Sequence, residues 1–518
     1  MAFPTLEQFT QLATQGNFVP VYQELAVDLD TPVSAWHKVC AGQPYSFLLE
    51  SVEGGETLGR YSLLGGDPLW VLESRGATTT QTYRDGTVKT YQGNPFEILP
   101  QCLAPYQPVK VPELPPGIGG LFGFWGYELI RWIEPTVTVY DRTAETDLPD
   151  GVWMQVDNLL IFDQVKRKIW AIAYADLRTP GQDLAVAYQA ACDRVAQLVQ
   201  KLMSPLQGLE PLLGWRSPAQ SDAPPVDFTS NRTREAFCDA VQQAKDYIRA
   251  GDIFQVVISQ RLSTQYPGDP FDLYRSLRLV NPSPFMAYFH FKDWQLIGSS
   301  PEVMVKAEHA ATGEDGIVAI VRPIAGTRPR GKTPQADEAY ATELLQDPKE
   351  IAEHVMLVDL GRNDLGRVCE SGSVTVDELM VIERYSHVMH IVSNVVGRLA
   401  PGKTAWDLLK ACFPAGTVSG APKIRAMQII HELEPDRRGP YSGVYGYYDF
   451  EGQLNTAITI RTMVVQPTPD GQCHISVQAG AGLVADSNPD SEYQETLNKA
   501  RGMLEAIRCL GASSDNPT

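Results

Sequence analysis

Cysteine and histidine are both scarce, with eight of each among 518 residues. No CxxC pair occurs, and no histidine lies at zinc-finger spacing from a cysteine. The common structural zinc sites are therefore excluded. We expect most of the cysteines to be buried, reduced and chemically inert.

Long apolar runs are missing as well. No stretch reaches the roughly 18 residues that a membrane-spanning helix needs. The N-terminal sequence MAFPTLEQFTQLATQ lacks a basic start followed by an apolar core, so no signal peptide is predicted. We expect a cytoplasmic protein that does not bind a membrane.

Positive charge is in deficit. The 43 Lys and Arg residues face 62 Asp and Glu residues, which gives a formal net charge of −19 at pH 7. A protein that binds the phosphate backbone needs a basic surface, so nucleic-acid binding is not expected. The excess of negative charge favours solubility instead.

The length and the hydrophobic content of 43% are sufficient for large cores and predict two or more domains. Residues 1–203 contain short strands at close spacing, which predicts an N-terminal α+β region built on antiparallel sheet. Residues 204–227 are rich in proline and lack periodicity, as in a surface linker. Residues 228–512 form the predicted second domain, followed by a disordered tail at 513–518.

Several local elements are predicted within these regions. Val152–Asp163 and Lys168–Ala175 are expected to pair as one hairpin, and Ala287–Phe291 with Trp294–Gly298 as another. A strong helix is predicted from Thr233 to Ala250, with a stop at the following glycine.

The stretch 478–499, QAGAGLVADSNPDSEYQETLNK, combines a glycine-punctuated strand with a helix. Ser491 and Gln494 form a predicted capping box, which places the helix start at Ser491. Glu492, Glu495 and Lys499 share one helical face, and a strand with few side chains beside them suggests a wall of a site for an anionic ligand. An exposed helix with a solvated Glu495–Lys499 pair explains the same pattern.

A second carboxylate cluster lies in KEIAEHVMLVDLGRNDLGR (349–367). One helical face carries Glu350, Glu353, His354 and Leu357, and the opposite face, with Ile351, Val355 and Val358, is predicted to be buried. Glu353 and Glu495 are the natural pair for a Mg²⁺ ion, which prefers oxygen ligands and uses one or two carboxylates. A surface helix with solvated glutamates is an equally good local interpretation.

Two loops have the composition of anion-binding segments. In RPIAGTRPRG (322–331), Arg328 and Arg330 could clamp a carboxylate, although an ordinary basic turn has the same composition. FPAGTVSGAPKIRAMQII (413–430) is a glycine loop that leads into a helix, whose free N–H groups attract anions. This loop does not match the P-loop pattern.

These motifs together resemble one family, the chorismate-utilising enzymes, and within it the large subunits of anthranilate synthase. The resemblance covers most of residues 230–510 and is thinner in the first half, where it rests mainly on LLES (48–51). It is carried by the following segments: DIFQVVISQR, NPSPFM, GSSPE, PIAGTRPRG, AEHVMLVDLGRND, YSHVMH, FPAGTVSGAPK and QAGAGLVADS with the helix after it.

The resemblance implies an α+β fold of antiparallel β-sheets packed as a sandwich, with helices on the outside and two intimately packed halves. It also implies a site for chorismate, a dicarboxylate, and Mg²⁺ held by Glu353 and Glu495. Glu302 matches the general acid for the departing ring hydroxyl, and His390 a histidine near the same group. The matching substrate contacts are Thr327, Tyr441, Arg461, Gly480, Gly482 and Lys499.

Two positions distinguish the branches of this family. The relatives that add water carry a lysine base where this chain has Gln255, and a neutral amide cannot deprotonate water. Aminodeoxychorismate synthases carry a nucleophilic lysine where this chain has Ala325. Both differences imply that ammonia adds to chorismate and pyruvate is then lost, giving anthranilate. An aminodeoxychorismate synthase that lacks its lysine and a non-catalytic tryptophan-binding paralogue are the alternatives.

The resemblance further implies a partner and an inhibitor. No glutaminase segment is visible in the chain, so a separate glutamine amidotransferase subunit is expected to deliver ammonia within a hetero-oligomer. LLES and NPSPFM match the family's tryptophan pocket, which predicts inhibition by tryptophan through Ser51, Pro282 and Met286. Phe285 stands where a tyrosine is commoner.

Overall fold

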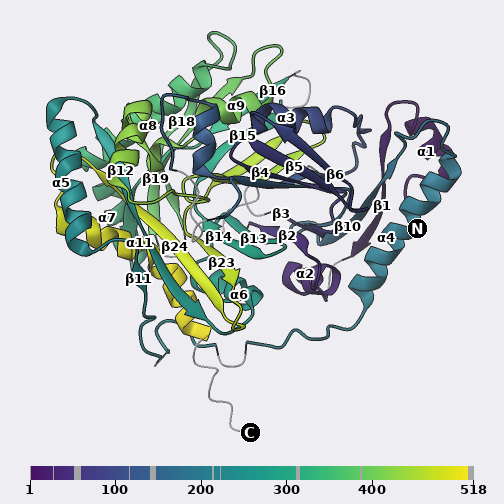
Figure 1. The fold of residues 1–518 in the computed structure, drawn as a ribbon, viewed down its shortest axis with the longest axis horizontal. Helices are drawn as coiled ribbons and strands as arrows, with labels where there is room; N and C mark the ends of the chain where they lie inside the picture. Colours follow the sequence, from purple (N-terminus) through teal and green to yellow (C-terminus); the bar gives the residue numbers. More distant parts are fainter. Residues whose placement is uncertain are drawn as a thin grey trace, which may run out of the picture.

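The chain folds around two large antiparallel sheets that face each other (Figure 1). The computed structural model describes residues 2–26, 29–51, 60–115, 117–140, 147–212, 215–221, 223–310, 316–385 and 388–510. The predicted tail at 513–518 and the last two residues of the range 228–512 lie outside these residues. Within the described part of the chain, no helix is both long and apolar enough to cross a membrane.

The first sheet has strands from both ends of the chain. Its spatial order is β1 (Phe18–Ala26), β10 (Lys168–Asp176), β9 (Asn158–Asp163), β3 (Tyr61–Gly66), β2 (Tyr45–Glu50), β13 (Phe285–Phe291), β14 (Trp294–Ser300), β23 (Thr462–Pro467), β24 (Cys473–Leu483), β12 (Gln255–Tyr266) and β11 (Thr229–Ser230), with β20 (Gly420–Ala421) also paired to β12.

The second sheet also contains strands from both parts of the chain. Its order is β17 (Ile324–Pro329), β19 (Val388–Arg398), β16 (Ile317–Val321), β15 (Val303–His309), β22 (Leu454–Ile458), β21 (Val444–Asp449), β7 (Gly120–Trp125), β8 (Gly151–Val156), β4 (Trp70–Arg75), β5 (Thr78–Tyr83) and β6 (Val88–Gln92), with β18 (Thr375–Arg384) also paired to β19.

The parts of the chain before and after the proline-rich segment are joined within each sheet. In the first sheet β2 pairs with β13, with Glu50 opposite Met286. In the second sheet β7 pairs with β21, with Trp125 opposite Val444. This confirms the α+β class with two packed antiparallel sheets, and the halves share both sheets.

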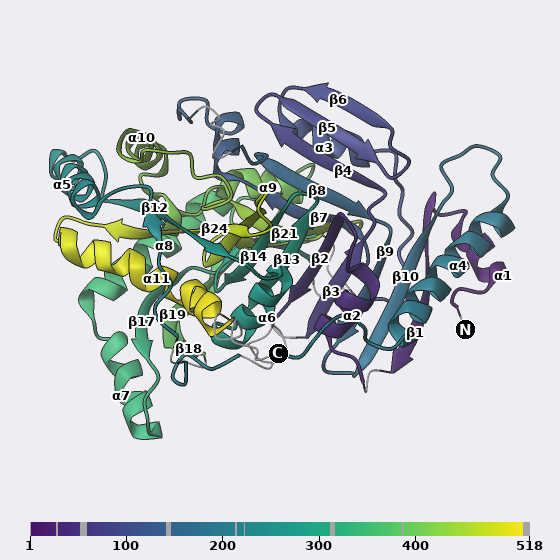
Figure 2. The ribbon, with the colours of Figure 1, turned by 60° about the horizontal axis from the view of Figure 1, so that its bottom comes forward.

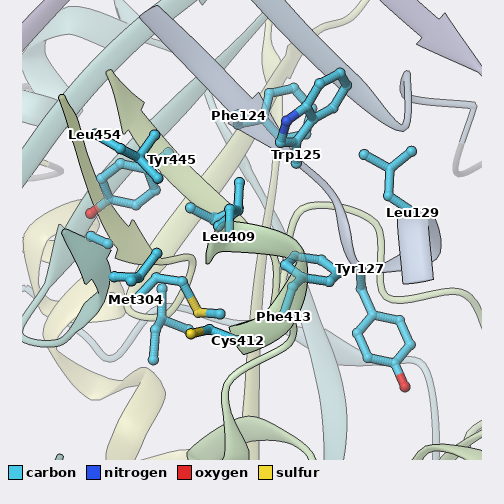
Figure 3. Close-up of a cluster of buried hydrophobic side chains, with 14 of the residues drawn as sticks. Phe124, Trp125, Tyr127, Leu129, Met304, Leu409, Cys412, Phe413, Tyr445 and Leu454 are labelled. Atoms are coloured by element: carbon cyan, nitrogen blue, oxygen red, sulfur yellow. The ribbon is translucent and has the colours of Figure 1, made fainter. Parts of the chain in front are cut away.

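Aromatic side chains fill the space between the sheets. Phe47 of β2 stacks on Phe122 of β7 with ring centroids 4.0 Å apart, and Phe124 lies 5.5 Å from Phe291. Figure 3 shows part of this core, with Phe124 and Tyr445 among its buried side chains. Burial of such large rings is a main source of stability.

Helices cover the outer faces of the sheets (Figures 1 and 2). The first sheet is covered mainly by α2 (Pro32–Cys40), α4 (Leu184–Met203), α5 (Arg234–Ala250), α6 (Pro270–Val280), α10 (Lys423–Leu433) and α11 (Pro489–Leu510). The second is covered by α7 (Pro334–Leu344), α8 (Pro348–Gly366) and α9 (Ala405–Cys412). The remaining helices are α1 (Leu6–Leu12), α3 (Pro95–Leu103) and the 3₁₀ turns η1 (Tyr127–Trp132) and η3 (Gly416–Val418).

The predicted hairpin of Val152–Asp163 with Lys168–Ala175 is only half right. Strand β9 does pair with β10, but β8 pairs with β4 and β7 in the other sheet. The chain crosses between the sheets at Asp157, whose buried carboxylate forms ion pairs with Arg84 at 2.6 Å and Arg194 at 2.5 Å. A continuous apolar run does not reveal this crossing, because both strands are buried.

Helix ends follow local capping chemistry. The helix predicted from Thr233 to Ala250 is confirmed, and Gly251 ends it in the left-handed conformation at φ 86°,. The start of α11 was predicted at Ser491 but lies at Pro489. The Asn488 side chain accepts hydrogen bonds from the N–H groups of residues 490 and 491, both at 3.1 Å, and so caps the helix earlier,.

Candidate active site

Helix α8 holds Glu350 and Glu353 in partly buried positions. The prediction that Val355 lies on the buried side is wrong, because its side chain is 43% exposed. The buried residues of the helix are His354, Leu357, Val358, Gly361 and Leu365. His354 Nε2 lies 2.6 Å from the Ser393 hydroxyl of β19. The helix is therefore rotated so that the face with Glu353 lies beside the sheet.

Glu353 of α8 and Glu495 of α11 are close enough to influence each other. Burial raises the pKa of Glu353, and the carboxylates of Glu350 and Glu495 raise it further, against Lys349 and Lys499. Glu495 Oε1 lies 2.6 Å from Lys499 Nζ. The two helices thus bring these carboxylates close enough for Glu495 to affect the charge of Glu353.

This pair suits a hard divalent cation that also binds an anionic ligand. Carboxylate oxygens are the donors that Mg²⁺ prefers. Burial and the nearby carboxylates of Glu350 and Glu495 raise the pKa of Glu353, and a bound cation would favour its charged form instead. Among the described residues no group of three or more His, Cys, Asp or Glu side chains forms a ready metal site. Further ligands would have to come from water and from the substrate.

Glycines on β24 leave room for other side chains beside this pair. A Cβ on Gly480 would lie 2.6 Å from the Tyr441 hydroxyl, and one on Gly482 would lie 2.8 Å from Gln255 Nε2. Lys499 Nζ donates to the Gly480 carbonyl oxygen at 3.0 Å. The two bare positions therefore bring Tyr441, Gln255 and Lys499 to one surface.

Arg461 lies in the tight connection between β22 and β23, with φ 51°. Burial lowers the pKa of its guanidinium, and Tyr441, Glu495 and Glu302 counteract this. No hydrogen bond within the described ranges involves the guanidinium. A half-buried cation without a hydrogen-bond partner among the described residues is well suited to bind a ligand carboxylate,.

Glu302 is a carboxyl group that can hold a proton near neutral pH. Burial raises its pKa to about 7, although a hydrogen bond from Thr417 and the charges of Lys499 and Arg461 act in the opposite direction. The Thr417 hydroxyl donates to Glu302 Oε1 at 2.9 Å. Burial is therefore the cause that lets this carboxyl group keep a proton near neutral pH,.

His390 of β19 lies close enough to Arg461 for that charge to affect it. Its Nδ1 is 2.8 Å from the Gly326 carbonyl oxygen and 3.2 Å from the Thr327 hydroxyl. A carbonyl only accepts, so Nδ1 carries the proton and Nε2 is the acceptor. Burial lowers the His390 pKa, which keeps the ring neutral, and Arg461 lowers it further.

Comparisons with known proteins identify the family of the chain. The family model described as chorismate binding enzyme matches residues 59–505. The chain belongs to the chorismate-binding enzymes.

Relatives of this chorismate-binding enzyme match over almost its whole length. Anthranilate synthase component 1 of Synechocystis sp. is 69% identical over 98% of this chain and 100% of the relative, and that of Acetivibrio thermocellus is 44% identical over 99% of each. The crystal structure of anthranilate synthase component I from Streptococcus pneumoniae TIGR4 is 37% identical, with a TM-score of 0.73, over 92% of this chain and 98% of that one.

The arginines of the 322–331 loop are already paired within this chorismate-binding enzyme, so the prediction of a free clamp is wrong. Arg328 pairs with Asp347 at 2.9 Å, and also with Glu343 and Glu350. Arg330 pairs with Asp337 at 2.8 Å. The acidic partners lie on α7, at the cap of α8 and in its first turn, so these arginines fasten the loop to the helices. Spacing alone did not reveal these partners.

A separate cavity of about 310 Å³ lies between the sheets, where β2 meets β13. Ser51 and Met286 both line it, whereas Pro282 does not and Pro284 and Phe285 do. The buried Ser51 hydroxyl has no hydrogen-bond partner among the described residues. This cavity contains two of the three residues predicted for the inhibitor.

Thr417 is a site residue that the sequence analysis did not identify. It lies in the glycine loop 413–423, which the sequence suggested as an anion-binding segment. The resemblance offered the only sequence signal, since the loop is one of the matching motifs. Its hydrogen-bond partner is 115 residues away in the chain, so no local pattern could indicate the contact.

Proposed function

We propose that this chain is the large subunit of an anthranilate synthase, which converts chorismate and ammonia to anthranilate and pyruvate. The observation that carries the proposal is the protonatable Glu302 beside the cations Arg461 and Lys499. These groups provide a proton for a leaving hydroxyl and positive charge for a dicarboxylate. The curated relatives of the same name support the assignment.

The residues would act on chorismate in a defined order. Arg461 and Lys499 bind its carboxylates, while Tyr441 and the strand at Gly480 and Gly482 hold the ring. Glu302 gives its proton to the ring hydroxyl, which leaves as water while ammonia forms a bond to ring carbon 2. The new ammonium group then loses one proton, which restores the proton balance of Glu302. The bond between the ring carbon and the enolpyruvyl oxygen then breaks as carbon 2 loses its proton, and the ring becomes aromatic. The released enolpyruvate gains a proton on its methylene carbon and becomes pyruvate, which balances the proton lost from carbon 2.

The neutral side chains near the ring favour ammonia over other nucleophiles. Gln255 is buried and its Oε1 has no partner among the described residues, so it can accept a hydrogen bond but cannot deprotonate water. Ala325 of β17 is also buried and has no nucleophilic group. His390 and Thr327, whose Nδ1 and hydroxyl lie 3.2 Å apart, would contact the ring hydroxyl.

Mg²⁺ is the cofactor that Glu353 and Glu495 would hold. When bound, it supplies positive charge that balances a substrate carboxylate against the two glutamates. The enzyme would act in the cytoplasm as a hetero-oligomer with a glutamine amidotransferase subunit that provides ammonia. Tryptophan would inhibit it from the cavity beside Ser51 and Met286.

Product identity tests this proposal directly. The purified chain is incubated with chorismate, MgCl₂ and an ammonium salt, and anthranilate is followed by its fluorescence. We expect anthranilate and pyruvate in equal amounts without any partner. An aminodeoxychorismate product would show that Ala325 was misinterpreted, and binding of tryptophan without turnover would identify a non-catalytic paralogue.

A further inference from the structure

Arg438 is a buried arginine whose guanidinium uses all five of its N–H donors. Nε and Nη2 bind the two carboxylate oxygens of Glu434, at 2.8 and 2.6 Å. Nη1 donates to the Val418 carbonyl at 2.7 Å and the Ser442 hydroxyl at 3.0 Å, and Nη2 also donates to the Val257 carbonyl at 2.8 Å. Its side chain is 1% exposed.

Each of these contacts lies next to a residue of the candidate active site. Val418 follows Thr417, which donates to Glu302. Val257 of β12 pairs with Gly482 of β24 and lies two residues from Gln255. The guanidinium also lies 5.4 Å from the centre of the Tyr441 ring.

Glu434 extends this connection. Its Oε1 accepts hydrogen bonds from the backbone N–H and the hydroxyl of Ser259, at 2.7 and 2.8 Å. Ser259 is the β12 residue opposite Gly480. The Arg438–Glu434 pair therefore joins β12, the 413–423 loop and the turn before Tyr441 through charge-assisted hydrogen bonds, which are short and directional.

We propose that Arg438 is a positioning residue that holds Thr417, Tyr441 and the start of β12 in register around the substrate. It touches none of the groups that bind carboxylates or metal in the proposed site. This inference rests on the proposed function, because it concerns the placement of Glu302 and its neighbours for that reaction.

The preceding residue provides a matched control. Arg437 is as buried as Arg438, but its Nη2 binds Asp150 at 2.5 Å and lies 3.5 Å from Glu128, both from the N-terminal half. Its Nε and Nη1 have no partner in the part of the chain that the structure describes. Lysine can replace one Nη2 contact, whereas it cannot reproduce the five donors that Arg438 uses.

The experiment compares Arg438→Lys with Arg437→Lys in the full chain. We expect Arg438→Lys to lower kcat about 10²-fold, since displacements of about 1 Å have such effects, with KM for chorismate changed less than about threefold. Thr417 would lose its anchor, and without its hydrogen bond Glu302 would lose its proton at higher pH. The fall of kcat at high pH should therefore shift to a higher pH in Arg438→Lys. Arg437→Lys should leave both kcat and the pH of this fall unchanged.

Equal losses in both variants, or an unchanged pH of this fall in Arg438→Lys, would overturn the proposal. If Arg438→Lys does not fold, Ser442→Ala removes one of the hydrogen-bond acceptors of Arg438. This variant should lower kcat about threefold or more and shift the fall of kcat to a higher pH. No change in kcat or in this pH would count against the proposal. The Glu302 proton can also be followed without turnover, by infrared absorption of the carboxyl group. Because the infrared signal needs no turnover, it tests the role of Arg438 even if the protein does not form anthranilate.

Discussion

At the scale of single residues, the environment of Glu302 determines the pH range in which the reaction can proceed. Burial raises its pKa to about 7, while Thr417, Lys499 and Arg461 limit that rise. A general acid works only while protonated, so kcat should fall as the pH rises above about 7. The pH dependence of kcat under saturating chorismate measures this directly.

The variant Glu302→Gln keeps the size of the side chain but removes its ability to donate a proton. We expect kcat to drop about 10²- to 10⁴-fold, the usual contribution of a positioned acid. The folded-state pKa is higher than the unfolded one, so the stability that protonated Glu302 contributes is present at low pH and is lost as the pH rises through about 7,. Glu302→Gln should therefore melt higher than the wild-type protein at pH 8.

The matched control for that measurement is Glu308→Gln. Glu308 lies on strand β15, which directly follows Glu302 in the chain. Its side chain is 47% exposed, so neither kcat nor the melting temperature should change appreciably. Loss of activity in both variants to the same degree would show that Glu302 has no special role as an acid.

Gln255 determines the nucleophile at the same scale. Gln255→Lys places an amine in a buried position, where desolvation lowers the pKa of lysine and yields a neutral base. We expect water addition to compete with ammonia addition, detected as an isochorismate-type product by chromatography. Gln255→Met removes the amide without adding a base, and there only anthranilate should form. A lysine variant that still makes anthranilate alone would refute this role for Gln255.

At the scale of elements, strand β2 and the start of β13 form the cavity in which tryptophan is proposed to bind. Ser51→Phe would fill part of its roughly 310 Å³, so the inhibition constant for tryptophan should rise about tenfold or more, as one to two kcal/mol of lost binding implies. Activity without tryptophan should persist, since none of the proposed catalytic residues lines the cavity.

The control for this prediction is Pro282→Ala, outside the cavity lining. Its inhibition constant should change less than about threefold, a difference within one kcal/mol. If Ser51→Phe remains fully sensitive to tryptophan, the inhibitor binds elsewhere.

Much at this scale could be predicted from sequence wherever the signal was local. Helix α5 with its terminal Gly251 and the hairpin β13–β14 followed directly from periodicity and turn residues. The crossing at Asp157 and the rotation of α8 that exposes Val355 did not, because both depend on partners distant in the chain. The same limit applies to the site, where motifs supplied Glu302 but not its contact with Thr417.

At the scale of the whole molecule, both sheets are continuous across the two halves of the chain. Strands β13 and β21 lose their partners β2 and β7 when residues 1–227 are removed. We expect a fragment of residues 228–518 to be aggregation-prone and without a cooperative thermal transition, since unpaired sheet edges are exposed. The intact chain should unfold in one transition by calorimetry, and two separate transitions would contradict a shared core.

The central claim concerns two carboxylates from separate helices that meet around a divalent cation and thereby accept a dianionic ring. Calorimetric titration of chorismate with and without Mg²⁺ tests it most directly, in the wild-type enzyme and in Glu353→Gln and Glu495→Gln. We predict that Mg²⁺ tightens chorismate binding about tenfold or more in the wild type, which corresponds to about 1.4 kcal/mol, and that each variant loses this gain. Equal chorismate affinity with and without Mg²⁺ in the wild-type enzyme would contradict the account.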